Sequence, residues 1–414
     1  MKGRLFRLFG PPLLACALVL GLLLAPLPRP ELSHHALDEA AVSMSDNVLL
    51  GTAIKRQALA SRFVPFIGSS ELSRLDPLHP SVLAAKYHRN YRPLLLGAAG
   101  TQSLTHFLAD QSWIRHYRNK RVVFIISPQW FTPQGVQPAA FEYFYSPLQT
   151  ITFIQHANPN RATDRYAARR ILQLNGKHSG AIHTALLNIA AEQPVTAGVR
   201  FRLKLQAALL RNEDTLFSRF FSHRKYARVQ QGIKRLPTVA TDKQLDALAV
   251  KIGAKDSSNN ALGIDNHFYK TRLSGNKLKH MRNKQAHFDY RRSPEYNDFQ
   301  LLLTQFAQNH VQVQFIIPPI NQKWAHYTGL SQAMCDQTVA KLHTQLHSQG
   351  FSHVLDLSQR GGEDFFMEDT IHLGWRGWVA VDEAVHPFLS RPQALDHYHI
   401  NQRFMTKAWA NATR

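Results

Sequence analysis

Short apolar runs that alternate with longer helical segments constrain the fold of this chain most strongly. Five runs have the length and apolar content of buried strands, at residues 63–67, 93–96, 122–126, 311–317 and 353–357. Helical segments lie near residues 79–89, 103–118, 294–309, 329–349 and 374–389. This alternation predicts an α/β fold of three layers, with a parallel sheet flanked by helices on both faces. Ligands of such folds bind at the carboxyl ends of the strands.

The alternation breaks between residues 151 and 292, where the chain is helical in character and strongly basic. Residues 161–292 carry 26 Lys and Arg against 9 Asp and Glu, which is most of the formal net charge of +21. Such an excess indicates an anionic partner, which could be nucleic acid, a membrane surface or a polyanionic substrate. We therefore expect a basic, mainly helical insertion at 151–292 between two parts of one α/β domain, 30–150 and 293–392. A polar tail, 393–414, would follow.

The N-terminal segment has the pattern of a membrane anchor. Residues 1–7 carry three positive charges, and no charged residue occurs from Leu8 to Leu27. About 20 apolar residues can span a bilayer as a helix, and the basic flank predicts a cytoplasmic N-terminus. The sequence thus predicts a basic tip and an uncleaved transmembrane signal anchor in residues 1–29, with the rest outside the cell. A cleaved signal peptide is the alternative.

The first predicted strand leads into a Gly-Ser-Ser turn that can present a nucleophile. Gly68 follows the strand, and Ser70 lies where a helix-compatible segment begins. A strand that ends in such a turn places a serine hydroxyl at the carboxyl edge of the sheet, near backbone N–H groups that can face an oxyanion. The alternative is that the same residues form only a turn and a helix cap.

A partner for Ser70 lies much later in the chain, in Asp369-Thr370-Ile371-His372. At this spacing the carboxylate can hold the imidazole Nδ1–H, which leaves Nε2 free to take a proton from a serine. The alternative is that Asp369 caps the following helix and His372 is an ordinary loop residue. Because the pair falls between the last predicted strand and the last helix, and completes the order Ser, Asp, His, we favour catalysis.

Other candidate site residues follow the second and third strands. Gly100 lies in a glycine-containing loop where a backbone N–H can point at an anion without a Cβ in the way. The amide of Gln129 can donate to the same oxyanion. A plain turn and an ordinary loop glutamine are the alternatives.

Binding residues are less clearly marked. No His-Glu-x-x-His or paired Cys-x-x-Cys motif occurs, so we expect no metal and no cofactor. Trp324 and Trp375 can line a pocket, although buried core aromatics are the simpler interpretation. A basic cluster can contact phosphates, with a solvated helix face as the alternative; it consists of Lys277, Lys279, Arg282 and Lys284.

With these motifs in this order, the chain resembles the SGNH (GDSL-like) hydrolases. Within that superfamily it is most similar to the DltD family of D-alanyl-lipoteichoic acid biosynthesis proteins. The stretches that carry this closer likeness are residues 66–72, 100–104, 124–131, 293–296, 315–324 and 369–375. The N-terminal anchor pattern also fits the family.

The resemblance implies specific roles for the candidate residues. Ser70 would be the nucleophile, His372 the general base and Asp369 its orienting carboxylate. The backbone N–H groups of Ser70 and Gly100 would form the oxyanion hole. Gln129 stands where generic SGNH enzymes carry Asn, so its longer side chain leaves the geometry at this position less defined.

The resemblance also implies a location and partners. The protein would be anchored on the outer face of a Gram-positive cell membrane and would act in D-alanylation of teichoic acids. The acceptor would be a teichoic acid, and the acyl donor would be a D-alanyl carrier protein or a membrane acyltransferase of the same pathway. Glu71 is a candidate neighbour for the D-alanyl ammonium group.

Two other functions remain open at this stage. A surface esterase that removes acyl groups from wall polymers would use the same residues, with water as the acceptor. A non-catalytic scaffold would recruit a D-alanyl carrier or a membrane acyltransferase and keep only a relict triad. Nucleic-acid binding through the basic insertion is disfavoured by the predicted export signal.

Overall fold

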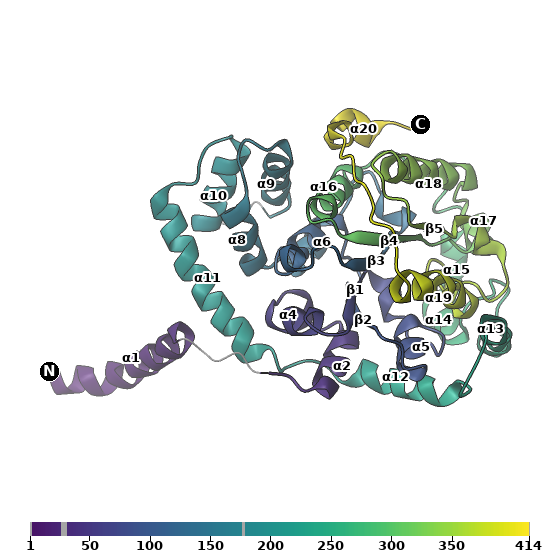
Figure 1. The fold of residues 1–414 in the computed structure, drawn as a ribbon, viewed down its shortest axis with the longest axis horizontal. Helices are drawn as coiled ribbons and strands as arrows, with labels where there is room; N and C mark the ends of the chain where they lie inside the picture. Colours follow the sequence, from purple (N-terminus) through teal and green to yellow (C-terminus); the bar gives the residue numbers. More distant parts are fainter. Residues whose placement is uncertain (1, 26–30, 176–178, 414) are drawn as a thin grey trace.

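A parallel sheet with helices on both faces forms the centre of the protein (Figure 1). The structure is a computed structural model that describes residues 2–25, 31–175 and 179–413. The strands are β1 (Phe63–Ile67), β2 (Arg92–Leu96), β3 (Arg121–Ile125), β4 (Gln312–Ile317) and β5 (Val354–Asp356). They lie in the order β2-β1-β3-β4-β5, and every neighbouring pair is parallel. The predicted α/β class and parallel sheet are therefore confirmed.

Successive residues along each strand enter two different hydrophobic cores, which explains why the runs are apolar throughout. On β3, Phe124 packs into one core, whereas Val123 and Ile125 pack into the other. Helices that contribute to the first core include α2 (His34–Ser43), α4 (Ala53–Leu59), α6 (Ser103–Asp110), α16 (Glu295–Gln308) and α18 (Gln332–His347). The second core includes residues of α5 (Pro80–Lys86) and α19 (Trp375–Ser390). Figure 1 shows α4, α6, α16 and α18 on one side of the sheet and α5 and α19 on the other, as expected for three layers, with α2 at the β2 end.

The segment between β3 and β4 supplies helices to both faces. Besides α16, its described α-helices are α7 (Pro138–Tyr143), α8 (Pro147–His156), α9 (Ala162–Leu174), α10 (Ala181–Ala190), α11 (Ala197–Phe217), α12 (Arg224–Arg235), α13 (Asp242–Asp256), α14 (Asn266–Phe268) and α15 (Asn276–Met281). Helices α8 to α11 extend the first core. The chain then follows the long helix α11 along the edge of the molecule (Figure 1). Helices α12 and α13 pack against α5 and α19 respectively, on the other face.

The N-terminal segment forms helix α1 (Lys2–Leu24), which projects from the body of the protein and contacts α11 (Figure 1). No helix within residues 2–25, 31–175 and 179–413 is long and apolar enough to cross a membrane. The predicted transmembrane anchor helix is therefore not found in this part of the chain. Residues 26–29, the end of the predicted anchor, lie outside the described residues.

The C-terminal tail packs back onto the domain. It contains α20 (Lys407–Asn411), and Phe404 just before it is fully buried. The Nζ atom of Lys341, on α18, donates to the carbonyl of Ala412 at 2.8 Å and to that of Arg291 at 2.8 Å. The remaining helices are α3 (Asp46–Leu49) and α17 (Gln322–Thr328).

Candidate active site

The turn after β1 is held against the loop after β2. The Gly68 carbonyl accepts hydrogen bonds from the Thr101 hydroxyl and from Nε2–H of His106, both at 2.8 Å. The Ser69 hydroxyl donates to the Ala98 carbonyl at 2.9 Å. Burial lowers the pKa of His106 to about 4, so the ring is neutral and the proton on Nε2 is the one it donates. These contacts fix where the next residue, Ser70, begins a 3-10 helix (Ser70–Ser73).

The two loops approach so closely that one position between them requires glycine. A Cβ on Gly97 would lie 2.0 Å from the carbonyl oxygen of Gly68, far inside van der Waals contact. A Cβ on Gly68 would lie 2.4 Å from Oε1 of Glu71. Gly97 is thus required by a close backbone approach, whereas the space at Gly68 is filled by the side chain of Glu71.

The structure brings Ser70, His372 and Asp369 into one chain of hydrogen bonds. Ser70 Oγ lies 2.7 Å from His372 Nε2, across 302 residues of sequence. His372 Nδ1 lies 2.8 Å from Asp369 Oδ2 and 2.9 Å from Oδ1. Because a carboxylate can only accept, Nδ1 carries the proton and Nε2 is free to accept from the serine hydroxyl. Such an arrangement can move a proton from Ser70 to the imidazole.

Asp369 and His372 lie in a short loop whose shape is held by hydrogen bonds between its own residues. An antiparallel bridge between Met367 and Leu373 closes the loop. Within it, Asp369 Oδ1 accepts from the backbone N–H groups of Ile371 at 3.0 Å and His372 at 3.1 Å. The same carboxylate thus shapes the loop and orients the imidazole.

The following helix does not use Asp369 as its cap. Helix α19 begins at Trp375, and Gly374 is its N-cap residue. The helix-capping alternative for Asp369 is therefore not what the structure contains.

Arg74 is the third partner of the Asp369 carboxylate. Its Nη2 lies 2.6 Å from Asp369 Oδ2, and its Nη1 lies 3.2 Å from Oε1 of Glu368. Asp369 is fully buried, and burial alone would raise its pKa. The hydrogen bond from His372 and the positive charge of Arg74 are among the causes that outweigh this effect, so the pKa of Asp369 is lowered and the carboxylate stays ionised.

The side chain of Glu71 points into the turn that contains Ser70. Its carboxylate is buried, and Oε1 accepts from the Ser69 N–H at 2.6 Å. Burial raises the pKa of this carboxyl. In this position Glu71 braces the residue before Ser70; its contact with a substrate ammonium stays a prediction.

The candidate oxyanion donors lie at the ends of neighbouring strands. Gly100 follows β2 and has φ +96°, a conformation that favours glycine. Gln129 lies in the 3-10 helix directly after β3 (Pro128–Trp130). Within the described residues, its Oε1 is buried without a hydrogen-bond partner. Because β1 pairs with both β2 and β3, these residues and Ser70 follow the same edge of the sheet.

The sequence matches one protein family over most of its length. The family model described as DltD protein matches residues 41–390, which include Ser70, Asp369 and His372. The chain belongs to the DltD family. It is 48% identical to Protein DltD of Lacticaseibacillus rhamnosus over 408 residues, which cover 98% of this chain and 96% of that protein. It is 30% identical to Protein DltD of Bacillus subtilis (strain 168) over 390 residues, which cover 92% and 97% respectively.

The predicted substrate-binding residues of this DltD-family chain lie in several places. Trp324 is buried in a small separate cluster with Leu262 and Leu273, whereas Trp375 is buried at the start of α19. The predicted basic cluster is exposed on and after α15; it comprises Lys277, Lys279, Arg282 and Lys284. No hydrogen bond or ion pair within the described residues joins any of these side chains to the hydrogen-bonded chain of Ser70, His372 and Asp369. Their roles stay predictions.

A large cavity lies beside Asp369, and the sequence did not reveal it. Its volume is about 540 Å³, and its lining includes Arg74, Glu368 and Trp375. Its basic lining includes residues of α12, and these were not singled out as site residues. Two signals were present in the sequence: Arg74 follows Ser70 by one helical turn, and Glu368 directly precedes Asp369.

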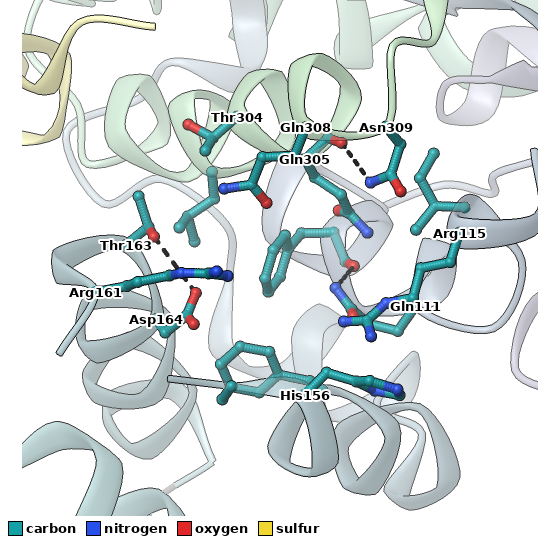
Figure 2. A pocket seen from close by; sticks show the side chains of 15 residues that line it. Gln111, Arg115, His156, Arg161, Thr163, Asp164, Thr304, Gln305, Gln308 and Asn309 are labelled. Carbon is teal, nitrogen blue, oxygen red and sulfur yellow. Dashed lines mark hydrogen bonds between the residues drawn. The ribbon is translucent and has the colours of Figure 1, made fainter. Parts of the chain in front are cut away.

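A smaller cavity of about 60 Å³ lies elsewhere, between α6, α8, α9 and α16 (Figure 2). Figure 2 shows Gln305 of α16 directed into it, together with Arg161 and Asp164. Ser70, Asp369 and His372 do not line this cavity. In the described part of the chain, no cluster of three His, Cys, Asp or Glu side chains is placed to hold a metal ion.

Proposed function

We propose that this DltD-family protein is a serine acyltransferase that acts in D-alanylation of teichoic acids through a D-alanyl ester on Ser70. The observation that carries the proposal is the hydrogen-bonded chain from Ser70 Oγ to His372 Nε2 at 2.7 Å, and from His372 Nδ1 to Asp369 at 2.8 Å. Family membership supports the substrate, because D-alanyl-lipoteichoic acid biosynthesis is the process that the family resemblance implies.

In the first step, Ser70 Oγ attacks the acyl carbon of a D-alanyl donor while His372 Nε2 takes the hydroxyl proton. The negative charge moves to the carbonyl oxygen, where the N–H groups of Ser70 and Gly100 and the amide of Gln129 would stabilise it. The tetrahedral intermediate then expels the thiol or alcohol of the donor, which receives the proton from His372. The product is a D-alanyl ester on Ser70.

In the second step, a hydroxyl of the polymer attacks the same acyl carbon and gives its proton to His372. The intermediate expels the Ser70 oxygen, which recovers the proton, and D-alanine ends as an ester on the polymer. Asp369 stabilises the imidazolium that forms in each half of the reaction. Its lowered pKa keeps the required negative charge in place.

The partners follow from this scheme. The acceptor is a teichoic acid, and the donor is a D-alanyl carrier or a membrane acyltransferase of the same pathway. We place the reaction at the outer face of the cell membrane, where such polymers are found.

A serine-directed phosphonate tests the nucleophile directly. The full chain is incubated with the reagent, and the labelled residue is mapped by mass spectrometry. We expect labelling at Ser70 that is absent in Ser70→Ala and lost in His372→Ala. A folded protein that is not labelled would contradict a catalytic role and favour the scaffold alternative.

Acyl transfer and hydrolysis differ only in the acceptor of the acyl group, which is a polymer hydroxyl in the first and water in the second. Both reactions use Ser70, His372 and Asp369. A variant of any of these residues should lose both reactions, so such variants cannot distinguish transfer from hydrolysis. We expect that a short poly(glycerol phosphate) shortens the lifetime of an acyl ester on Ser70 and itself becomes acylated. If the ester lifetime is unchanged by the polymer and the free acid is the only product, the protein is an esterase.

A further inference from the structure

The large cavity beside Asp369 has one wall that is continuous with the nucleophile turn. Ser73 and Arg74 line it, and the Ser73 hydroxyl donates to the Ser70 carbonyl at 2.6 Å. Glu368, the neighbour of Asp369, lines it as well. A ligand in this cavity therefore lies against residues that directly hold Ser70 and Asp369.

The opposite lining comes from the basic helix α12. Arg224, Lys225 and Arg228 contribute to it from the first turns of the helix, and Arg228 follows the other two by four and three residues, so it neighbours both on the helix surface. Arg235, at the end of the same helix, also lines the cavity. Within the described ranges, none of these three side chains has a hydrogen bond or ion pair to a protein group. Burial and the nearby Arg228 lower the pKa of Lys225 to about 8. The three cations thus repel one another, and none of them has a direct carboxylate partner among the described residues.

Four carboxylates also line the cavity, and three of them have partners elsewhere in the protein. Glu368 pairs with Arg74 at 3.2 Å. Asp76 accepts from the Leu78 N–H at 2.6 Å, and burial raises its pKa to about 7. Asp265 accepts from the Phe268 N–H at 2.7 Å. Asp256 is the fourth acidic residue of the lining.

The charge pattern selects a class of ligand. The face on α12 fits an anion with several oxygen acceptors, which a phosphodiester provides. The acidic and polar wall near Arg74 fits the hydroxyl or ammonium groups of the same ligand. A polyol phosphate chain that carries D-alanyl ammonium groups has both features.

We propose that this cavity binds a phosphodiester of the acceptor polymer through Arg224, Lys225 and Arg228. This inference rests on the proposed function, because it names the acceptor subsite of that reaction. It assigns polymer binding to α12 rather than to the exposed cluster at residues 277–284. That cluster lies outside the lining of this cavity.

Binding of a soluble phosphodiester to the full chain tests the subsite without requiring turnover. The probe is glycerophosphoglycerol, and its affinity is measured by calorimetry for the wild type and for the triple variant R224A/K225A/R228A. Loss of charge-assisted bonds to the phosphate should weaken binding by about tenfold or more. The matched control is Lys234→Ala, a cation of the same helix outside the cavity lining, which should change the affinity by less than about twofold.

Two further variants keep the test decisive. The double variant R224K/R228K retains the charge and reports on binding if the triple variant fails to fold. It should bind the probe more weakly than the wild type, because lysine cannot make the bidentate contacts of arginine. Ser70→Ala should bind the probe like the wild type, since the subsite does not require the nucleophile.

The outcomes separate the inference from the proposed function. Equal affinity of the wild type and the triple variant for the probe overturns the inference, even if Ser70 is labelled by the phosphonate. The inference also fails if phosphatidylglycerol vesicles or inorganic phosphate bind through these residues and glycerophosphoglycerol does not. Probe binding that depends on α12 in a protein whose Ser70 is not labelled supports the subsite and contradicts only the acyl transfer.

Discussion

Arg74 Nη2 lies 2.6 Å from Asp369 Oδ2, so the carboxylate that orients His372 is shared between an imidazole and a guanidinium. Arg74 Nη2 also lies 3.3 Å from His372 Nδ1. Both of these nitrogens are donors, so they form no hydrogen bond with each other. Each donates instead to the Asp369 carboxylate. Arg74 is therefore a positioning residue for the proposed triad, and it connects the triad to the large cavity.

Replacing Arg74 by alanine should slow phosphonate labelling of Ser70 by about tenfold, because a charge-assisted bond to Asp369 is lost. Arg74 is one of the groups that lower the pKa of Asp369, so this pKa should rise in the variant. Asp369 is then protonated at a higher pH than in the wild type, and the deficit in labelling should grow as the pH falls. Arg74→Lys should recover part of the rate. The same ratio of rates at every pH would contradict this role.

Asp369→Asn should reduce labelling of Ser70 by about 10³- to 10⁴-fold, because the amide no longer fixes the required tautomer of His372. The asparagine Oδ1 can still accept from the N–H groups of Ile371 and His372, which keeps the loop in shape. Thermal unfolding measured alongside should therefore show a folded protein. A variant that labels within tenfold of the wild type would show that Asp369 serves the loop and not the imidazole.

His79 should make the protein less stable in acid. The ring is fully buried, accepts from the Ser81 N–H and contacts Trp378, and burial lowers its pKa to about 3. The ordinary pKa is about 6.5, so the unfolded chain binds a proton first as the pH falls. The contribution of the neutral ring to the free energy of unfolding is fully present above pH 6.5. It is lost progressively as the pH falls from about 6.5 to about 3.

The size of this effect is about 2 kcal/mol between pH 7 and pH 5. His79→Asn keeps an acceptor at the start of α5 and removes the titration. We expect its free energy of unfolding, measured in urea, to be lower at pH 8 because packing on Trp378 is lost, but to fall less steeply with acid. Parallel pH curves for the wild type and the variant would rule out His79 as the source.

Gly97→Ala should disrupt the nucleophile turn, because the new Cβ would meet the Gly68 carbonyl at 2.0 Å. We expect a lower melting temperature together with loss of Ser70 labelling. The matched control is Gly198→Ala in α11, where a Cβ has no neighbour within 4 Å. The control should stabilise the protein slightly, by about 0.5 kcal/mol, through higher helix propensity. Normal labelling of Gly97→Ala would show that the turn can shift without consequence.

The sheet could be predicted because its signal is local. Each strand is a short apolar run, and the predicted run 63–67 has the same bounds as β1. The meeting of Ser70 and His372 was also predictable in outline, since residues that follow parallel strands share one edge of the sheet. The hydrogen bond between them places the two side chains as the sequence predicted, whereas their catalytic role stays a prediction.

The rest depends on contacts between distant segments. Arg224 and Arg74 line one cavity although 150 positions separate them, and no spacing rule relates such residues. The direction of the Glu71 side chain depends on the backbone of the turn, because its carboxylate accepts from the Ser69 N–H. The apolar composition of the N-terminus predicted a membrane span, and no such helix is found in the described residues.

The loop that holds Asp369 and His372 has a consequence for synthesis of the chain. Ser70 is translated early, whereas its hydrogen-bond partner lies 302 residues later. A nascent chain or a fragment that ends before residue 369 contains the serine turn but cannot form the bond between Ser70 and His372. The hydroxyl therefore stays an ordinary alcohol on the ribosome, and it gains its partner only when the final helix and the loop before it join the sheet.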